Sequence, residues 1–392
     1  MADRPLEQLT NCCQHFSTDV RVSKLVIQLH EPTPPAPTPA RPETARSSFG
    51  NKGLPWREVG ALLRAARMTR PPLPEWAPHE AVWIGFPSDP ELWLADLRPA
   101  QQEVAAFAKA VHAGGKGEKV WLVASHEDAA AAARELAPFA TVVVEPFGDI
   151  WLRDTGPILT GSGKARRAQG FRFNGWGAKY DLPGDETIGE RLAGHAGFPF
   201  SKADWILEGG AIDGDGSGTI VTTEQCLLNT NRNSAMARED VEQALASDLG
   251  IERVVWLGEG LANDHTDGHV DNLARFVAPG RIAIPTPAKD DPNSAVYRDA
   301  ARRLRETKLD VVTLPSPGRI VNEDGDIVPA SYMNFYIGNA VVVVPQYGAP
   351  NDKAAVDVVR ALFPGRVAIG LRADHILTGG GSFHCISQQV PQ

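Results

Sequence analysis

The sequence is poor in cysteine and lacks the patterns that mark secreted and membrane proteins. Four of its 392 residues are cysteine, and none has the spacing of a zinc-binding finger. No apolar run approaches the ~20 residues that a membrane-spanning helix needs. The first residues also lack the basic stretch and apolar run of a secretory signal. These absences predict a cytoplasmic protein with reduced thiols and no membrane partner.

Basic segments and phosphate-binding loops are equally scarce. The formal net charge is −9, and a short basic piece such as RDAARRLRETK (298–308) has the pattern of a charged helix face. Nucleic acid is therefore not expected as a partner. Neither GxGxxG nor GxxxxGK[ST] occurs, so no phosphate-binding loop opens a predicted helix.

Proline is concentrated near the start of the chain. Six prolines fall between Pro32 and Pro42, in HEPTPPAPTPARPETARSS, a composition that builds neither helix nor sheet. Compact, aromatic-containing sequence begins with MTRPPLPEWAPHEAVWIGFP (68–87). We therefore expect a disordered extension over residues 1–70 and a single folded domain over residues 71–392. Removal of residues 1–67 is expected to leave the domain folded and functional.

After residue 80, short β-rich runs alternate with helical stretches. The runs include AVWIGFP, KVWLVAS, TVVVEPF and AVVVVPQ, and stretches such as RPAQQEVAAFAKAVHAG have apolar residues at helical spacing. This alternation predicts an α/β fold. Gly-rich hairpin turns between strands favour a repeated ββαβ unit over a doubly wound sheet. Residues 72–391 would hold five units of about 65 residues each in a radial arrangement.

The first candidate for chemistry is GDIWLRDTGPI (148–158). Trp151, Arg153 and Asp154 precede the tripeptide TGP, a pattern typical of the end of a strand. A carboxylate at such a strand end would face a central cavity. The alternative is that Asp154 caps a turn and pairs with Arg153 at the surface, and the motif alone does not exclude it.

The second candidate is Glu208, which is followed by two glycines that leave space beside it. The next residues have a rival interpretation, because Asp213, Asp215 and Glu224 match ligand positions of an EF-hand calcium loop. An EF-hand needs a helix on each side, whereas LEGGAI and TIVTT have the composition of strands around a DGDGSG hairpin. A calcium-binding module at 213–224 is kept as the non-enzymatic alternative.

The third candidate, GEGLANDHTDGHVDNLARF (258–276), contains two histidines among several aspartates. His265 and His269 are four residues apart, as in zinc-binding helices, but Gly268 interrupts a helix here. The stretch HVDNLARFV alternates instead, and in a strand His269 and Asp271 would point to one face. A histidine beside a carboxylate suits acid–base chemistry. A metal site and a purely structural His–Asp pair are the alternatives.

The fourth candidate is GGGSFHCISQQ (379–389). Cys385 follows three glycines, which would let a ligand approach closely, and with a distant histidine it would form a nucleophile and its proton partner. The alternative is an inert buried thiol on the last strand, which is the interpretation given to Cys226 in its apolar run. His384 is not expected to be the partner, because neighbouring strand residues point to opposite faces.

Together these motifs resemble the agmatine deiminase family of guanidine-modifying enzymes, and the resemblance runs from about residue 75 to the end of the sequence. The matching stretches are EWAPHEAVWIGFP, DIWLRDTGP, EGGAIDGDGSGTIVTTEQCLLNTNRN, DGHVDN, SYMNFYIGNAVVVVPQYG and GGGSFHCISQQVP. The related bacterial peptidylarginine deiminases share the DIWLRD-like, HVD and cysteine segments. The resemblance implies a fivefold pseudosymmetric α/β propeller of ββαβ units, a pentein-like fold, with the active site near its axis.

The resemblance also implies a role for each candidate in the hydrolysis of a guanidinium. Asp154 and Asp271 would bind the N–H edges of the cation, and Cys385 would attack its carbon. His269 would act first as a general acid and then as a base. Glu208 would orient His269 and hold its charge.

The implied reaction converts agmatine and water to N-carbamoylputrescine and ammonia, a step of polyamine biosynthesis. The substrate is a small cationic guanidine, and neither a metal nor an organic cofactor is expected. Trp151 and Asn334 would line the substrate pocket by family position. A homodimer is expected on the same ground.

One departure from the family pattern bears on the substrate. Agmatine-specific members carry Asn-Ile before the His-Cys pair, where this sequence has Ser382-Phe383. We expect these two residues to affect recognition of the substrate beyond its guanidinium. Free arginine, peptidyl-arginine and an amidinotransferase reaction, which uses the same thiol intermediate, therefore remain as alternatives.

Overall fold

Strands and helices alternate along residues 70–392, which the computed structural model describes. The predicted α/β fold is confirmed. The proline-rich segment and the rest of the predicted extension up to residue 69 lie outside the described residues. The expectation of disorder there stays a prediction.

The strands of residues 70–392 form five small mixed sheets. Each sheet contains one antiparallel pair, joined to two parallel pairs in the first sheet and to one parallel pair in each of the others. In the second sheet, for example, β5 is antiparallel to β4 and parallel to β6. The strand orders are β16-β1-β2-β3, β4-β5-β6, β7-β8-β9, β10-β11-β12 and β13-β14-β15. The bounds are β1 (His79–Gly85), β2 (Lys119–Ala124), β3 (Thr141–Val144), β4 (Ile158–Thr160), β5 (Arg167–Arg172), β6 (Phe200–Ile206), β7 (Asp213–Gly214), β8 (Thr219–Thr223), β9 (Arg253–Leu257), β10 (Arg275–Ala278), β11 (Arg281–Thr286), β12 (Asp310–Pro315), β13 (Tyr336–Ile337), β14 (Val341–Gln346), β15 (Val367–Arg372) and β16 (Ser387–Pro391).

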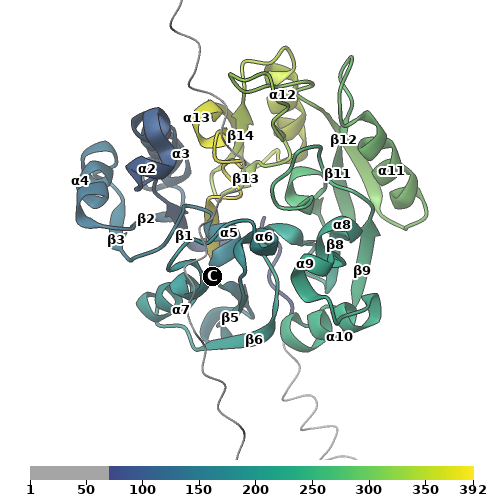
Figure 1. Cartoon of the computed structure of the whole chain (residues 1–392), viewed down its shortest axis with the longest axis horizontal. Helices are drawn as coiled ribbons and strands as arrows, with labels where there is room; N and C mark the ends of the chain where they lie inside the picture. The colour runs from purple at the N-terminus through teal and green to yellow at the C-terminus, as the bar shows by residue number, and fades with distance from the viewer. Residues whose placement is uncertain (1–69) are drawn as a thin grey trace, which may run out of the picture. The chain divides into compact units, whose positions relative to one another are not determined.

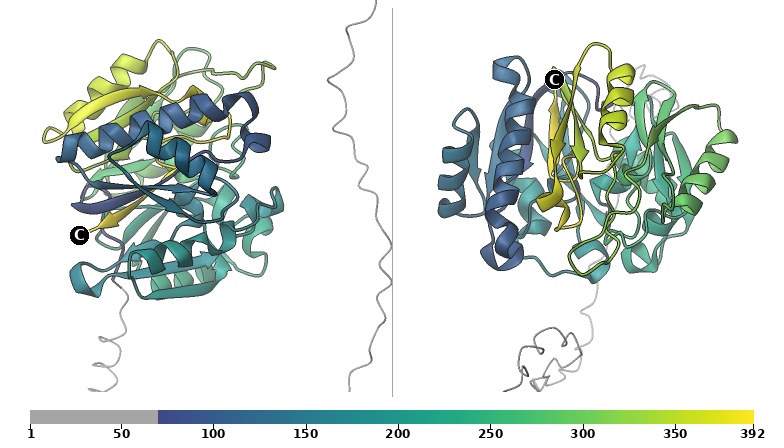
Figure 2. Two further views of the ribbon diagram at one scale, coloured as in Figure 1. Left: turned by 90° about the vertical axis from the view of Figure 1, so that its left-hand side faces the viewer. Right: turned by 90° about the horizontal axis from the view of Figure 1, so that it is seen from above.

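A helix connects the two strands of each parallel pair, so the order strand, strand, helix, strand recurs along the chain. In Figure 1 these helices lie toward the outside of the view and the strands toward its middle. Seen from the left-hand side in Figure 2, α3 and α4 lie in front of the first sheet. The connecting helices are α3 (Leu97–His112), α4 (Glu127–Leu136), α7 (Asp185–His195), α10 (Arg238–Leu249), α11 (Ser294–Arg305) and α12 (Asp352–Leu362). Within residues 70–392, no helix has the length and apolar character that a membrane span requires.

Short helices and 3-10 turns lie between these elements, and several of them carry the candidate site residues. The short α-helices are α2 (Pro90–Trp93), α5 (Leu152–Thr155), α6 (Gly175–Ala178), α8 (Glu224–Leu227), α9 (Thr230–Asn233) and α13 (Asp374–Leu377). The 3-10 turns are η1 (Leu94–Asp96), η2 (Ala113–Gly115), η3 (Gly163–Ala165), η4 (Gly209–Ala211) and η5 (Val270–Asn272).

Helix α11 shows why the basic stretch at 298–308 is a helix face. Tyr297 and Leu304 are buried on its inner side, while Arg302 and Arg303 both pair with Asp299 one turn earlier. Basic side chains in the last turn also complement the negative end of the helix dipole. The charged-face prediction for this segment is confirmed.

Aromatic packing fixes the segment before β16 to helix α3. The rings of Phe107 and Phe383 stack with their centroids 4.8 Å apart, and both side chains are fully buried. Tyr336 of β13 packs edge-on against the same Phe107 ring. Each such side chain contributes roughly 1.5–3 kcal/mol by burial. This packing anchors the chain two residues before Cys385.

The first and last described strands pair with each other. β1 is antiparallel to β16, with Ile84 opposite Ser387, and parallel to β2 on its other edge. The backbone N–H of Gly85 extends this pairing by donating to the carbonyl of Ile386 at 2.9 Å. In Figure 1 the C-terminus lies near the middle of the view. The pairing fixes the end of the chain, with Cys385 two residues before β16, against the first described strand.

Candidate active site

The predicted site residues lie in the five segments that connect one sheet to the next. These segments are 145–157, 207–212, 258–274, 316–335 and 373–386. They carry, in the same order, Trp151 and Asp154, then Glu208, then His269 and Asp271, then Asn334, and finally Cys385. Residues that are up to about 230 positions apart in the sequence therefore depend on the fold to meet.

Cys385 is held by Asn334 and lies beside Asp271. Nδ2 of Asn334 donates to Sγ of Cys385 at 3.0 Å, and this sulfur lies 3.4 Å from Oδ2 of Asp271. Oδ1 of Asn334 accepts from the backbone N–H groups of His384 and Cys385 at 3.0 and 3.2 Å. Burial and the charges of Asp271 and Asp154 raise the pKa of Cys385 well above its ordinary value. The sulfur is therefore a thiol at neutral pH in the free protein.

The glycine run before Cys385 permits a close approach to an indole ring. A Cβ on Gly379 or on Gly381 would lie 2.6 Å from a ring carbon of Trp151, and one on Gly381 would also lie 3.1 Å from Sγ of Cys385. Gly380 has a φ of +100°, which side chains other than glycine rarely adopt. These glycines thus leave room for the indole ring of Trp151, and the close approach of a substrate stays a prediction.

Asp154 and Asp271 are neighbouring buried carboxylates. A Cβ on Gly210 would lie 2.9 Å from Oδ1 of Asp154 and 3.2 Å from Oδ2 of Asp271, so the two groups face each other across this glycine. Oδ1 of Asp154 accepts from the N–H of Gly210 at 2.9 Å, and its Oδ2 accepts from the indole of Trp176 at 3.0 Å. Oδ1 of Asp271 is buried without a hydrogen-bond partner. A cation with several N–H groups would satisfy it.

His269 stands between Asp154 and Glu208. Its Nδ1 lies 3.6 Å from Oδ1 of Asp154, and its Nε2 lies 4.0 Å from Oε2 of Glu208. Burial lowers the pKa of His269, but the charge of Asp154, the interaction with Cys226 and the charge of Glu208 outweigh burial and raise the pKa well above its ordinary value. The ring is therefore an imidazolium that can give a proton. Both ring nitrogens are buried without a hydrogen-bond partner.

A buried arginine holds Glu208 in place. Nε of Arg232, in α9, donates to Oε1 of Glu208 at 2.7 Å, and its Nη1 donates to Oδ2 of Asp267 at 2.7 Å. The other Glu208 oxygen, Oε2, has no hydrogen-bond partner and faces His269. Arg232 was missed by the sequence reasoning, because the segment NTNRN gives no sign of which distant carboxylate it will meet.

A cavity of about 180 Å³ opens next to Cys385. Its described walls are largely aromatic, and they include two carboxylates but no lysine or arginine. Asp149 is one of these carboxylates: its two oxygens accept from the indole N–H groups of Trp93 and Trp151 at 3.0 and 2.6 Å. The lining residues are Leu92, Trp93, Asp149, Trp151, Asp154, Trp176, Tyr180, Leu182, His265, Thr266, Asn272, Thr378, Gly379, Gly380, Gly381 and Cys385.

The chain also matches known proteins along nearly all of its described length. The family model described as Porphyromonas-type peptidyl-arginine deiminase matches residues 72–391. The chain belongs to this family. The match covers nearly all of the described residues, and it includes every predicted site residue.

Relatives of the chain are named as agmatine deiminases. A curated Yersinia pestis protein that carries this name is 36% identical over 346 residues, which is 81% of this chain and 94% of that protein. The solved agmatine deiminase of Enterococcus faecalis is 32% identical with a TM-score of 0.78, covering 84% of this chain and 97% of that one. A C. jejuni agmatine deiminase variant solved with substrate bound is 29% identical with a TM-score of 0.74, covering 82% and 96%.

The predicted local structure around the site is wrong in two places. His269 and Asp271 do not alternate along a strand, because they lie at and within the 3-10 turn η5 (Val270–Asn272). Cys385 does not lie on the last strand, because β16 begins at Ser387. The strand argument against His384 as the partner of Cys385 does not hold, because Nδ1 of His384 lies 2.8 Å from Oδ2 of Asp271. The assignment of His269 as that partner stays a prediction. Alternation of faces holds for extended backbone and not for the turn that carries these side chains.

Cys226 is fully buried in an apolar cluster, as its interpretation as a structural thiol predicts. It is buried beside the acid–base pair, and ligand atoms of Glu208, Cys226 and His269 all lie within 4.8 Å of one another. These three groups could hold a thiophilic metal ion. Two of them are the predicted proton-transfer residues. The expected absence of a cofactor stays a prediction.

The calcium-loop alternative at 213–224 fails in the structure. Strands β7 and β8 flank the DGDGSG hairpin and pair with each other, so the two helices of an EF-hand are missing there. Asp213 is already engaged, because its Oδ2 accepts from Nε of Arg275 at 2.5 Å and its Oδ1 from the N–H of Phe276 at 2.7 Å. Oδ1 of Asp215 accepts from three groups of its own turn. The segment is a hairpin, as its composition predicted.

The residues that depart from the family pattern do not line the cavity. Phe383 stacks on Phe107 in the core, and neither Ser382 nor Phe383 is among the lining residues. Direct contact with a ligand in this cavity is therefore not indicated for either residue, and their effect on substrate recognition stays a prediction. The residues that line the cavity include Asp149, Trp151 and Tyr180 instead.

Proposed function

We propose that the protein is an agmatine deiminase that hydrolyses agmatine to N-carbamoylputrescine and ammonia through a covalent intermediate on Cys385. The observation that carries this proposal is the composition of the cavity. It presents a thiol, the carboxylates Asp154 and Asp149 and aromatic walls, with no basic side chain of arginine or lysine among its described residues. Such a site suits a substrate with positive charge and no carboxylate.

Binding of the guanidinium is the first step in this proposal. The planar cation donates to Asp154 and to the unpartnered Oδ1 of Asp271, which places its carbon beside Sγ of Cys385. Burial raises the pKa of Asp154, although the charge of His269 partly offsets the rise. The arriving positive charge stabilises both carboxylates and favours loss of the Cys385 proton, whose pKa the two carboxylates raise in the free protein.

The chemical steps then need one acid–base group. The thiolate attacks the guanidinium carbon, and His269 gives a proton to the departing nitrogen, which leaves as ammonia. The product of this half-reaction is an S-alkylthiouronium on Cys385. His269, now neutral, takes a proton from water as the water attacks the same carbon, and the thiolate leaves. Glu208 stabilises the charged imidazole before ammonia leaves and again after water attacks, because its free Oε2 faces Nε2 of His269.

Asp149 supports an ammonium at the other end of the substrate. The indole of Trp151 lies between Gly381 and Asp149: ring carbons of the indole lie against the glycine, and its N–H donates to the carboxylate. Burial raises the pKa of Asp149 to about 6, so the group is mostly ionised at neutral pH. Each oxygen accepts one indole N–H and keeps a lone pair for a second donor. The primary ammonium of agmatine would be this second donor to Asp149.

A substrate panel tests the assignment. Agmatine, free arginine, a peptidyl-arginine and simple alkylguanidines are each scored for ammonia release and for the ureido product. Agmatine is expected to have the highest kcat/KM, and Cys385→Ala is expected to abolish ammonia release while the far-ultraviolet spectrum is unchanged. A preference for arginine, or transfer of the amidino group to an added amine in place of hydrolysis, would refute the proposal.

We also propose the finer architecture that the sequence predicted. The five units would stand around one axis as a fivefold pseudosymmetric α/β propeller, with residues 71–392 as the catalytic domain. The recurrence of one unit order and the pairing of β16 with β1 support this arrangement. A homodimer stays a prediction from the resemblance.

A further inference from the structure

His384 lies between two buried carboxylates. Its Nδ1 lies 2.8 Å from Oδ2 of Asp271, its Nε2 lies 2.7 Å from Oε1 of Glu75, and its side chain is 1% exposed. An ionised carboxylate accepts hydrogen bonds and cannot donate them. His384 can therefore donate to Asp271 and to Glu75 at the same time only when both of its ring nitrogens carry hydrogen. This is the imidazolium form.

The Asp271 contact connects this histidine to the reacting sulfur. Oδ2 of Asp271 meets both Nδ1 of His384 and Sγ of Cys385, at 2.8 and 3.4 Å. Because His384 occupies Oδ2, the other oxygen is left unpartnered for a ligand. Burial alone would raise the pKa of Asp271, but the hydrogen bond and charge of His384 outweigh it and the pKa lies below its ordinary value. This carboxylate is ionised although it lies near Asp154.

The Glu75 contact supplies the counter-charge. Glu75 also pairs with Nη1 of Arg153 at 3.1 Å and with Arg275, which in turn pairs with Asp213. The carboxylates Glu75, Asp213 and Asp271 bring three negative charges, and Arg153 and Arg275 bring two positive charges, so one negative charge is left over. A positive His384 balances the cluster, and buried charges are tolerated when they are paired in this way.

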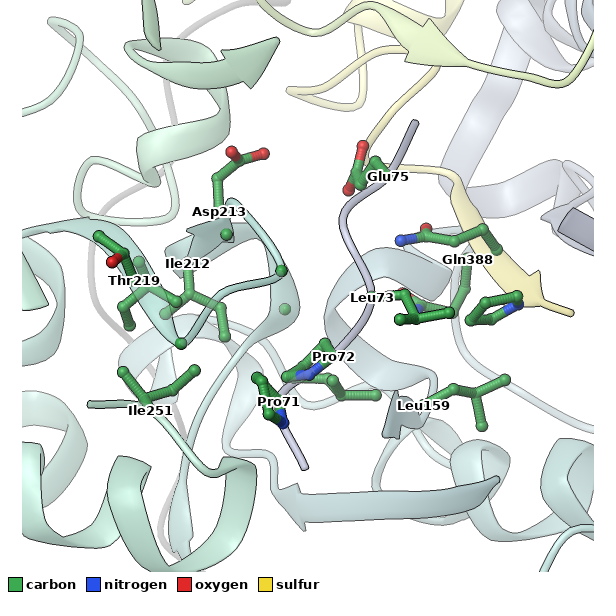
Figure 3. Close-up of a pocket in the computed structure, with 18 of the residues that line it drawn as sticks. Pro71, Pro72, Leu73, Glu75, Leu159, Ile212, Asp213, Thr219, Ile251 and Gln388 are labelled. Carbon is green, nitrogen blue, oxygen red and sulfur yellow. The ribbon is translucent and has the colours of Figure 1, made fainter. Parts of the chain in front are cut away.

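Glu75 reaches a second cavity, which is shown in Figure 3. This cavity of about 60 Å³ is lined by Glu75, Pro71, Pro72, Asp213 and Gln388 among others, and it shares no lining residue with the cavity at Cys385. The chain of contacts Asp271, His384, Glu75 therefore runs from the nucleophile to a separate space. Asp271 lies in η5, His384 lies in the segment before β16, and Glu75 lies in the segment before β1.

We propose that His384 is a positioning residue of the reaction: held as an imidazolium by Glu75, it keeps Asp271 ionised and turned toward the substrate guanidinium. This inference rests on the proposed function for its kinetic consequences, but not for the state of the ring. Without the imidazolium, Asp271 would share a buried site with Asp154 and would take up a proton more easily. Guanidinium binding then weakens at low pH.

The variants His384→Asn and Glu75→Gln separate positioning from simple folding. His384→Asn keeps a donor near Asp271 but removes the charge, so the acid limb of kcat/KM against pH is expected to move up by about one unit, with a KM for agmatine that is ~10-fold higher. Glu75→Gln keeps an acceptor for Nε2 but removes the counter-charge. The acid limb of this variant is expected to move in the same direction as that of His384→Asn, because the charge that lowers the pKa of Asp271 is no longer held in place.

His79→Asn is the matched control, because His79 is also buried, pairs with Glu118 at 3.0 Å, and makes no ion pair with Glu75 or Asp271. It is expected to lower the melting temperature and leave both limbs in place. Unshifted limbs in folded His384→Asn and Glu75→Gln, or equal shifts in His79→Asn, would overturn the proposal.

The protonation state of the ring can be measured without turnover. Nitrogen-15 NMR of the wild-type chain labelled at histidine, with His384→Asn used for assignment, is expected to show both His384 nitrogens protonated at pH 7.5. A neutral tautomer there overturns the inference whether or not agmatine is the substrate. Absence of ammonia release from agmatine by the wild-type chain would instead refute the proposed function and leave this measurement valid. If His384→Asn does not fold, Glu75→Gln supplies the assignment through its shifted resonances.

Discussion

The indole N–H of Trp151 donates to Oδ2 of Asp149 at 2.6 Å, which fixes a buried carboxylate in the wall of the cavity beside Cys385. The same indole lies against Gly379 and Gly381. The position of this carboxylate relative to the nucleophile is thus set by one rigid ring. The fixed position of Asp149 relative to Cys385 would select substrates by the distance between their guanidinium and their second charged group.

Replacement of Asp149 should separate recognition of the two ends of agmatine. Asp149→Asn is expected to raise the KM for agmatine ~10- to 100-fold, because a desolvated charge pair is lost. For an alkylguanidine without an amino group the same variant should change KM by less than ~3-fold. The pKa of Asp149 is about 6, so protonation below that pH should weaken agmatine binding, and this dependence should be missing in the variant. Equal losses for both substrates would contradict the assignment.

The thiol of Cys385 should be unreactive at neutral pH in the free protein. Burial and the charges of Asp271 and Asp154 raise its pKa, so alkylation by iodoacetamide should increase steadily above the ordinary thiol pKa of about 8.5. Asp271→Asn removes a nearby negative charge, so it should increase alkylation at pH 8 while it decreases turnover. Peptide mapping against Cys385→Ser distinguishes the label from one on Cys226. A thiol that is fully reactive at pH 7 would contradict this account.

The two histidines of the third motif should differ in importance. His269 is buried between Asp154 and Glu208, whereas His265 is exposed and bonds to the hydroxyl of Tyr180 at 2.9 Å. His269→Ala should lower kcat by ~10²- to 10⁴-fold, the usual contribution of a general acid–base group. His265→Ala should mainly raise KM, because it lines the cavity. A larger loss of kcat in His265→Ala would show that the acid–base assignment is wrong.

A single methyl group at Gly210 should inactivate the site. A Cβ there would lie 2.6 Å from Nδ1 of His269 and 2.9 Å from Oδ1 of Asp154, closer than any real contact. Gly210→Ala is therefore expected to lower kcat by at least ~100-fold, since misplacing reacting groups by about 1 Å has an effect of this size. Gly214→Ala is the control, because Gly214 lies nearby in β7 and a Cβ there would meet a side-chain carbon of Ile220 at an ordinary 3.4 Å. Similar activity in the two variants would mean that the catalytic groups can move aside.

Restoring the usual family residues before the His-Cys pair should not change the substrate preference. Phe383 is stacked on Phe107 away from the cavity, so Ser382→Asn combined with Phe383→Ile should leave the ratio of agmatine to arginine kcat/KM within ~3-fold. The loss of a stacked, buried ring should instead destabilise the fold by roughly 1–3 kcal/mol. Thermal unfolding measures this loss. A changed substrate ratio would return these residues to the recognition site.

The sequence was informative where the chemistry dictates a residue type. A thiol, an imidazole and carboxylates in short stretches that resemble the family motifs pointed to Cys385, His269, Glu208, Asp154 and Asp271, and the structure brings them together. Their secondary structure was predicted less well. Extended alternation was assumed around His269 and Cys385, where the chain forms turns whose conformation depends on contacts with other units.

Supporting residues were the ones that sequence reasoning missed. Arg232, Trp176 and Glu75 each contact a site residue that lies in a different segment, and nothing within their own stretches shows the partner. Asp149 was overlooked in the motif GDIWLRDTGPI, although Trp151 of the same motif was singled out. A carboxylate next to an indole is common on protein surfaces, and here its burial makes it distinctive.

The pairing of β1 with β16 makes catalytic competence a property of the whole described chain. This contact joins strands about 300 residues apart, so it is among the most demanding to form by chain diffusion. Helices such as α3 and α11 can form from local contacts alone. The thiol meets its carboxylates and its imidazole after that distant closure, and a protein caught with every helix in place but the last strand free would look folded and carry no chemistry.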